Sequence, residues 1–325
     1  MTNSDQRIHF IVGIWRSGTT LMKEVLGMEP KAKVFPEHMI TLNNLHLAND
    51  FSRSKKIILS NILKNPDFTH FAQPDSDLLS NTFIGSNSFR NGILASFNAC
   101  LKANESIETF IDKNPIYSYF LPEILNLFPK SKIVWMLREP KDNCISRKKY
   151  NIQSFKNYSY LAHWWNETNL QIAKQVQLNP ERFLLVSYDA MVKEPEEWVR
   201  KICRFLDLPF NKEMLSFESK KDERVEHFKK SVKSRDGKID KNYSQQKAAM
   251  WENLQKPINT SKLKQWEKEL TEKEIKAIDF YTKDFYEALL SGNYSFRPKA
   301  NLVYKALMNF SLYKLKRDIR LLKKV

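Results

Sequence analysis

The sequence predicts an α/β fold in which helices flank a central parallel sheet. Short apolar segments alternate with segments whose apolar residues recur at helical spacing, which is typical of βαβ units. One short segment, 132–137 (KIVWML), is apolar almost throughout, as expected for a parallel strand buried on both faces. No strand pattern is evident after about residue 190, so the C-terminal part is predicted to be helical.

Each predicted element rests on its own pattern. The predicted strands are short, mostly apolar runs, and they lie at 7–13, 33–35, 107–111, 132–137 and 183–187. The predicted helices have apolar residues three and four positions apart, and they lie at 18–28, 40–65, 91–103, 116–128, 141–150, 158–178, 195–206, 271–290 and 300–322. Residues 66–90, which contain two prolines and several Ser and Asn residues, are predicted to be irregular, and 219–250 to be a polar loop. We expect one domain over 1–290 and a basic helical extension over 291–325.

The charge balance narrows the class of partner. The chain carries 53 Lys and Arg residues against 37 Asp and Glu residues, which gives a net charge of +16. This excess favours an anionic partner, such as nucleic acid, a phospholipid surface or a phosphorylated small molecule. Residues 299–325 hold eight basic side chains and one acidic side chain. The apolar residues between them would either pack on the core or let the segment lie on a membrane surface.

Targeting and metal-binding signals are not evident in the sequence. No apolar run approaches the ~18 residues that a membrane helix needs. The N-terminus lacks the basic and apolar regions of a signal peptide, so we expect a cytoplasmic protein. Cys100, Cys144 and Cys203 are far apart and form no C-x-x-C pair, so neither a disulfide framework nor a metal site is predicted.

A glycine-containing loop follows the first predicted strand. Residues 13–20 read GIWRSGTT and lead directly into a predicted helix. Both glycines and the final Thr have the spacing of the nucleotide-binding loop G-x-x-x-x-G-K-[ST], but Thr19 replaces the Lys and the positive charge lies instead at Arg16. Backbone N–H groups at such a helix start favour an anion. We therefore expect a cradle for an anion other than a metal-bound triphosphate.

The segment WRSGTTLM resembles the phosphosulfate loop of the sulfotransferases that use 3′-phosphoadenosine 5′-phosphosulfate (PAPS). That family binds the 3′-phosphate with an Arg after a strand and a Ser eight residues later, and Arg138 and Ser146 match this pattern. An Arg at the carboxyl end of a parallel strand can bind phosphate bidentately. The resemblance implies a P-loop-type three-layer fold, PAPS as donor, 3′-phosphoadenosine 5′-phosphate (PAP) as product and no metal. It implies the donor-binding residues Arg16, Ser17, Gly18, Thr19, Thr20, Arg138, Ser146, Tyr188 and Lys256.

The chain is most similar to the tyrosylprotein sulfotransferase branch, in which a Glu accepts the proton of the acceptor hydroxyl. Glu37 lies 18 residues after Thr19, which is the spacing of that Glu, and His38 is the rival base. Lys113 lies 25 residues before the Arg of the second motif and resembles the family Lys that stabilises the transition state. The resemblance implies direct in-line transfer, with Glu37 as base and with Arg16 and Lys113 stabilising the moving sulfonate and the leaving phosphate.

Other positions match the family less closely. Tyr188 matches the Tyr after the last strand, and Lys256, in KPIN, resembles a late cofactor-binding Lys. Ser244 is a candidate for a late cofactor-contacting Ser. Tyr150 stands where the family has an Arg in the helix after the second motif, with Arg147 and Lys148 close by.

The motifs do not fix the acceptor, which could be a sugar, a tyrosine or a small molecule, and nucleic acid is not expected as a partner. Two other classes compete with the sulfotransferase interpretation. A P-loop kinase or nucleotide hydrolase would need the missing Lys and would not use the second motif. A basic module that binds a membrane peripherally would use residues 300–325 and would not need a phosphosulfate loop.

Overall fold

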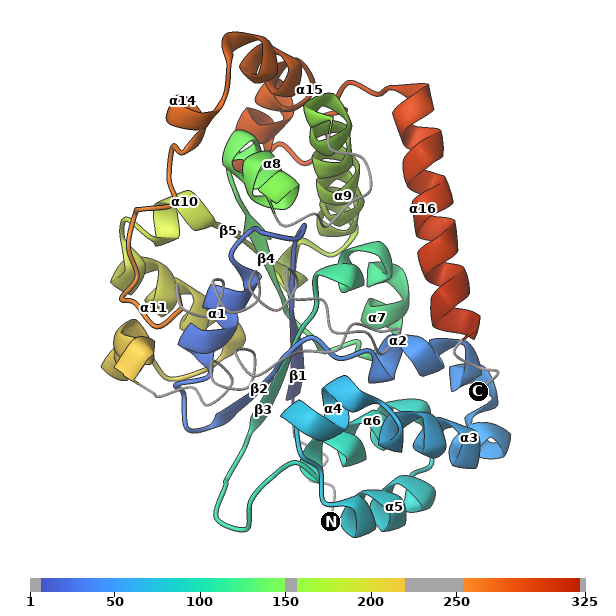
Figure 1. The fold of residues 1–325 in the computed structure, drawn as a ribbon. Helices are drawn as coiled ribbons and strands as arrows, with labels where there is room; N and C mark the ends of the chain where they lie inside the picture. The colour runs from blue at the N-terminus through green and yellow to red at the C-terminus, as the bar shows by residue number, and fades with distance from the viewer. Residues whose placement is uncertain (1–6, 150–156, 220–253, 322–325) are drawn as a thin grey trace.

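The computed structural model describes residues 7–149, 157–219 and 254–321, and within it the five predicted strands form one parallel sheet (Figure 1). The strands are β1 (Arg7–Val12), β2 (Ala32–Phe35), β3 (Thr109–Lys113), β4 (Ile133–Leu137) and β5 (Phe183–Ser187). Their order is β2-β3-β1-β4-β5, so β1 is central. The segments that follow β1, β3 and β4 therefore emerge side by side at one edge of the sheet.

The described helices and 3-10 turns cover both faces of this sheet (Figure 1). Their bounds are α1 (Thr19–Leu26), α2 (Ile40–Asn44), η1 (Leu45–Asp50), α3 (Phe51–Leu63), α4 (Pro66–Phe71), α5 (Ser76–Gly85), α6 (Phe89–Asn98), η2 (Pro115–Tyr119), α7 (Leu121–Leu127), α8 (Pro140–Lys149), α9 (Tyr158–Leu178), η3 (Pro180–Arg182), α10 (Tyr188–Met191), α11 (Pro195–Leu206), η4 (Lys212–Ser219), α14 (Trp266–Glu269), α15 (Glu272–Leu290) and α16 (Leu302–Leu321).

The alternation of side chains along each strand divides the core into two layers. Phe10 and Trp135 point into a large cluster with α7, α9 and α15, whereas Ile11 and Met136 point into a second cluster with α1 and α11. Successive residues of a strand face opposite sides, so each buried strand must be apolar on both faces. This confirms the predicted three-layer α/β fold.

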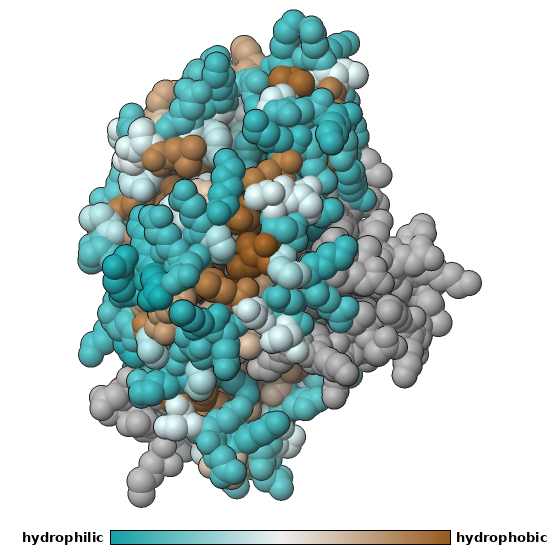
Figure 2. All heavy atoms as spheres, turned by 90° about the vertical axis from the view of Figure 1, so that its left-hand side faces the viewer, coloured by the Kyte–Doolittle hydropathy of each residue, from teal (hydrophilic) through white to brown (hydrophobic). Residues whose placement is uncertain are grey.

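Apolar side chains are sparse on the outer surface of the α1 and α11 layer. Figure 2 shows this side of the molecule as mostly hydrophilic, with small groups of apolar residues. Scattered apolar side chains of this kind are normal on a protein surface.

The prediction that 66–90 is irregular is wrong, because α4, α5 and the start of α6 lie there. Its polar residues cap helices. The side chain of Asn65 accepts from the N–H of the third residue onward, Asp75 caps α5 in the same way, and Ser88 caps α6. Pro66 occupies the first turn of α4, where its missing N–H costs nothing.

Two helices that were predicted to be continuous are divided. The predicted helix 40–65 consists of α2, the 3-10 turn η1 and α3, and the predicted helix 116–128 consists of η2 and α7. Asn114 caps η2 with its side-chain oxygen, and Phe120 leaves the helical conformation between η2 and α7. The apolar spacing continues across such turns, so it does not reveal the interruption.

Helix α16 lies beside α9 and reaches α2 (Figure 1). Within this helix, Met308 is buried and Tyr304 and Leu307 pack against the main core, whereas Leu302 and Phe310 are exposed. Thus, over the first half of α16, one face packs on the protein. Of the two alternatives predicted from the sequence, packing on the core or lying on a membrane surface, this is the first. None of the helices described has the length and hydropathy that crossing a membrane requires.

Candidate active site

The loop between β1 and α1 has a conformation that requires glycine at two positions. Gly13 has φ +144° and Gly18 has φ +89°, and residues that carry a side chain rarely adopt such values. A Cβ atom on Gly13 would lie 2.5 Å from the carbonyl oxygen of Met136, and one on Gly18 would lie 2.4 Å from the ring of Tyr188. Gly18 is also the N-cap of α1, so no side chain covers the first-turn amides from that position. These amides can face an anion.

The second motif lies directly against this loop. The Arg16 Nε donates to Ser146 Oγ at 3.0 Å, and Arg138 Nη1 donates to the carbonyl oxygen of Arg16 at 3.1 Å. The guanidinium of Arg138 also lies 4.9 Å from the centre of the Tyr188 ring. Arg138 is 6% exposed, and its Nε has no hydrogen-bond partner among the described residues. The fold therefore brings together the two motifs that the sequence predicted to bind opposite ends of one donor.

Asn143 is a further contact between the two motifs that sequence reasoning missed. Its amide donates to the carbonyl oxygen of Trp15 at 3.0 Å and to Ser17 Oγ at 3.2 Å. Asn143 lies three residues before Ser146, one helical turn away, which is the signal that could have identified it.

Basic side chains, Arg138 among them, gather around Lys262. The Nη2 of Arg138 donates to the carbonyl oxygen of Lys262 at 2.8 Å. Burial lowers the pKa of the Lys262 ammonium, and the positive charges of Lys149, Arg138, Lys256 and Arg16 lower it further. A group of cations that repel one another is suited to a multiply charged anion such as a phosphate monoester. Lys262 was not predicted, and its only sequence signal is its position six residues after Lys256.

The predicted base and the predicted transition-state Lys form an ion pair. Lys113 Nζ lies 2.6 Å from Glu37 Oε1. The pair forms because β2 and β3 are adjacent parallel strands with Phe35 opposite Asp112, so the residues just beyond both strands meet. The Lys113 side chain is 4% exposed and the Glu37 side chain is 47% exposed. The carboxylate is thus the part of the pair that an incoming molecule can reach.

His38, the rival base, is sealed inside the protein. Its side chain is 0% exposed and is surrounded by the rings of Phe35, Phe68 and Phe97. Burial lowers the pKa of His38 to about 3, so the ring is neutral at physiological pH. A solvent-borne hydroxyl cannot reach this ring without opening the core.

The remaining residues singled out in the sequence lie in different places. Tyr188 begins α10 and packs over Gly18, between the loop and Arg138. Arg147 is buried and donates to the carbonyl oxygen of Leu161, so it points away from the site. Ser244 and Tyr150 lie outside the described residues.

Together, the parallel sheet, the glycine loop after β1 and the basic residues after β4 define an α/β protein with a phosphate-binding loop at the carboxyl ends of its strands. A family model described as "Sulfotransferase family" matches residues 9–212. The chain belongs to this family.

Curated relatives and a solved structure are similar to this chain. The protein-tyrosine sulfotransferase of Drosophila melanogaster is 27% identical over 236 residues, covering 67% of this chain and 43% of the relative. Protein-tyrosine sulfotransferase 1 of Danio rerio is 27% identical over 223 residues, covering 66% of this chain and 57% of the relative. The chain thus spans about half the length of these two relatives. The sulfotransferase domain of a Synechococcus olefin synthase has the same fold, with a TM-score of 0.54 and 18% identity over 86% of this chain and 96% of that one.

Proposed function

We propose that this protein transfers the sulfuryl group of PAPS to the hydroxyl of an acceptor. The observation that carries the proposal is the contact between the two motifs, in which Arg16 of the loop binds Ser146 and Arg138 binds the loop backbone. Such an arrangement suits a ligand that has an anionic group at each end, one at the loop and one near Arg138. The Glu37–Lys113 pair beside it supplies groups for proton transfer and charge stabilisation.

The residues present fit the donor. Gly18 and the first turn of α1 would bind the 5′-phosphosulfate through backbone N–H groups, with Ser17, Thr19 and Thr20 contributing the hydroxyls of the loop. Arg138, Ser146 and the cations around Lys262 would bind the 3′-phosphate. When bound, PAPS supplies the sulfuryl group and a good leaving phosphate.

The chemistry assigned to the chain's own residues is limited to proton transfer and charge stabilisation. Glu37 accepts the proton of the acceptor hydroxyl while the acceptor oxygen forms its bond to sulfur. The bond between sulfur and the bridging oxygen breaks in the same step, and its electron pair leaves with PAP. Lys113 and Arg16 stabilise the charge on the transferred group and on the leaving phosphate.

The acceptor is proposed at two levels. An acceptor that loses a proton, here an O–H group, is the general requirement, because Glu37 accepts that proton. Within that class we propose a phenolic hydroxyl of tyrosine first, since the relatives are named for tyrosine, and a sugar or small-molecule hydroxyl as alternatives.

The first experiment is a calorimetric titration with PAP, with adenosine 5′-monophosphate and ATP–Mg²⁺ as controls. The wild-type protein should bind PAP far more tightly than either control. Arg138→Ala should lose about 1.5–3 kcal/mol of that binding, roughly tenfold to more than a hundredfold in affinity. A preference for ATP–Mg²⁺, or no nucleotide binding, would exclude the proposed donor.

The second experiment identifies the acceptor. The protein is incubated with PAPS labelled in its sulfuryl group and with a tyrosine-containing peptide, 4-nitrophenol and an oligosaccharide, each in a separate reaction. Label in one of these products assigns the acceptor class. Without an added acceptor, release of labelled sulfate measures transfer of the sulfuryl group to water. This rate reports turnover independently of the three acceptors tested.

A further inference from the structure

A set of buried contacts lies directly behind the Glu37–Lys113 pair. Asp112, Lys113 and Asn114 are consecutive, and each contacts the segment that follows β2. Lys113 contacts Glu37, and the residues on either side of Lys113 both contact His38. We call these three residues the clamp.

Asn114 fixes the backbone next to Glu37. Its side-chain amide is buried and donates to the carbonyl oxygen of His38 at 3.0 Å and to the sulfur of Met39 at 3.4 Å. Its side-chain oxygen accepts from the N–H of Ile116 at 3.0 Å, so both ends of the amide are engaged. A buried amide with both ends bound holds one orientation, since breaking either bond leaves a polar group without a partner.

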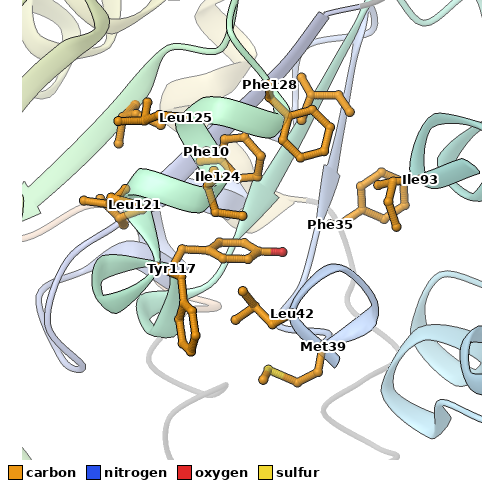
Figure 3. Close-up of a cluster of buried hydrophobic side chains, with 14 of the residues drawn as sticks. Phe10, Phe35, Met39, Leu42, Ile93, Tyr117, Leu121, Ile124, Leu125 and Phe128 are labelled. Carbon is orange, nitrogen blue, oxygen red and sulfur yellow. The ribbon is translucent and has the colours of Figure 1, made fainter. Parts of the chain in front are cut away.

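His38 is held from the other side by the shape of its surroundings, with Asp112 in van der Waals contact. Its Nε2 lies 3.5 Å from Asp112 Oδ1, and the second carboxylate oxygen of Asp112 accepts from the hydroxyl of Tyr117. In Figure 3 the Tyr117 ring lies across the cluster that contains Leu42 and Met39. Asp112, Tyr117 and His38 are all buried. These three polar side chains therefore lie within a closely packed apolar core.

The clamp is also linked to the donor loop. The N–H of Asn114 donates to the carbonyl oxygen of Ile11 in β1 at 3.2 Å, two residues before Gly13. The N–H of Gly13 in turn donates to Ser118 Oγ, in the same 3-10 turn that Asn114 caps, at 3.2 Å. One rigid unit therefore spans the end of β1, the start of the loop and the segment that carries Glu37.

From this geometry we infer that Asn114 and His38 are positioning residues that fix the Glu37 carboxylate relative to the donor loop. This inference rests on the proposed role of Glu37. Neither residue touches the reacting atoms. Asn114 holds the chain at His38, and the His38 ring, wedged among aromatic side chains, stops that chain from rotating, so Glu37 and its Lys113 partner keep one geometry. Misplacing a catalytic group by about 1 Å can cost about a hundredfold in rate.

The test compares Asn114→Ala in two backgrounds. In the wild-type background it should lower kcat at least tenfold, while the KM for PAPS and the affinity for PAP stay within about twofold. In the Glu37→Gln background it should change kcat less than twofold, because a residue that acts through Glu37 has no effect once the carboxylate is gone. Turnover is measured with 4-nitrophenol, and as release of labelled sulfate from PAPS where the phenol is not used.

Two further variants separate positioning from folding. Asn114→Ser keeps a capping oxygen for η2 but cannot bind the His38 carbonyl as the amide does, so it should show the same loss of kcat. Asn166→Ala removes a similar buried bond, from the Asn166 amide to the carbonyl oxygen of Tyr281 at 2.7 Å, and should leave kcat unchanged at a comparable cost in stability.

The outcomes distinguish this inference from the proposed function. An inactive Glu37→Gln protein beside a fully active Asn114→Ala protein would overturn the clamp and leave the base in place. Restoration of kcat by Asn114→Ser, or an equal loss in both backgrounds, would also overturn it. Full activity of Glu37→Gln would remove both the base and the positioning role that depends on it.

Discussion

The side chain of Arg16 donates a hydrogen bond to the hydroxyl of Ser146, although 130 residues separate them in the sequence. The loop after β1 and the helix after β4 meet there because β1 and β4 are adjacent parallel strands. The bond joins the group proposed to hold the sulfonate end of the donor to a group proposed to hold its 3′-phosphate. Each end of the donor should therefore affect binding of the other.

Lys262 should contribute to recognition of the 3′-phosphate. The Lys262→Ala protein should bind PAP about tenfold more weakly, because it loses one of several cations around Arg138. Binding of adenosine 5′-monophosphate should change much less, since that nucleotide lacks the 3′-phosphate. Calorimetry at low and high salt measures both effects. Lys264→Ala is the matched control, because its side chain is 70% exposed and its ammonium pairs with Glu267. Equal losses in the two variants would indicate a general charge effect only.

Replacing Gly18 should disrupt the loop by more than the cost of placing a side chain at its positive φ. A side chain at a positive φ costs about 1–2 kcal/mol. In Gly18→Ala the added Cβ also meets the ring of Tyr188, so PAP affinity should fall at least tenfold. Gly292→Ala is the control, because Gly292 also has a positive φ but its added Cβ has no heavy atom within 4 Å. Titration with PAP and thermal unfolding of both variants give the comparison. Wild-type affinity in Gly18→Ala would mean that the Tyr188 ring moves aside freely.

Glu37→Gln should lose turnover and keep the donor. General-base catalysis contributes about 10²–10⁴-fold, so kcat should fall by that order while PAP affinity stays within about twofold. The control is Glu108→Gln, which breaks an exposed Lys31–Glu108 ion pair of 2.7 Å at the amino ends of β2 and β3. Initial rates and PAP titration are measured side by side. A Glu37→Gln protein with near-normal kcat would show that another group accepts the proton.

The stability of the fold should depend on pH through Asp112. Burial raises the pKa of its carboxyl from the ordinary 3.8 to about 8, against the opposing effects of the Tyr117 hydrogen bond and the Lys113 charge. Between these values the folded protein retains a proton that the unfolded chain has released. This contribution to stability is therefore complete below about pH 4 and is lost as the pH rises towards 8, at up to about 1.4 kcal/mol per pH unit.

Asp112→Asn removes that titration and keeps an oxygen that accepts from Tyr117. The free energy of unfolding of the wild type, relative to the variant, should therefore fall steadily from pH 5 to pH 8. Urea denaturation of both proteins at several pH values measures the difference between their free energies of unfolding. Groups that titrate alike in the two proteins contribute equally to both values and drop out of this difference. A difference that does not change with pH would mean that Asp112 is ionised in the folded protein.

The strands and the two donor motifs were predictable because their signals are local. A buried parallel strand must be apolar on both faces, and a tight anion-binding loop must place glycine where a side chain would clash, as at Gly13 and Gly18. These constraints act on neighbouring residues and can be recognised without knowledge of the fold. The same holds for the spacing between Arg138 and Ser146, which is about two turns of one helix.

The helices within 66–90 were missed because Asn, Asp and Ser, the residue types at 65, 75 and 88, are favoured both in turns and at helix N-caps. Which role they take depends on the apolar surface against which the following residues pack. Phe68, Leu79 and Phe83 are buried in the main core, and that burial stabilises helices too short to form alone.

The class of fold, the anion loop and the candidate groups at Glu37 and Lys113 follow from patterns and motifs within short stretches of the chain. The folded chain was needed to show that these two side chains pair, that His38 is enclosed by aromatic rings, and that Lys262 lies among Arg16, Arg138 and two other cations. Burial and charge contacts between segments far apart in the chain depend on how the strands are ordered in the sheet. That order results from packing of the whole core, which no local pattern records.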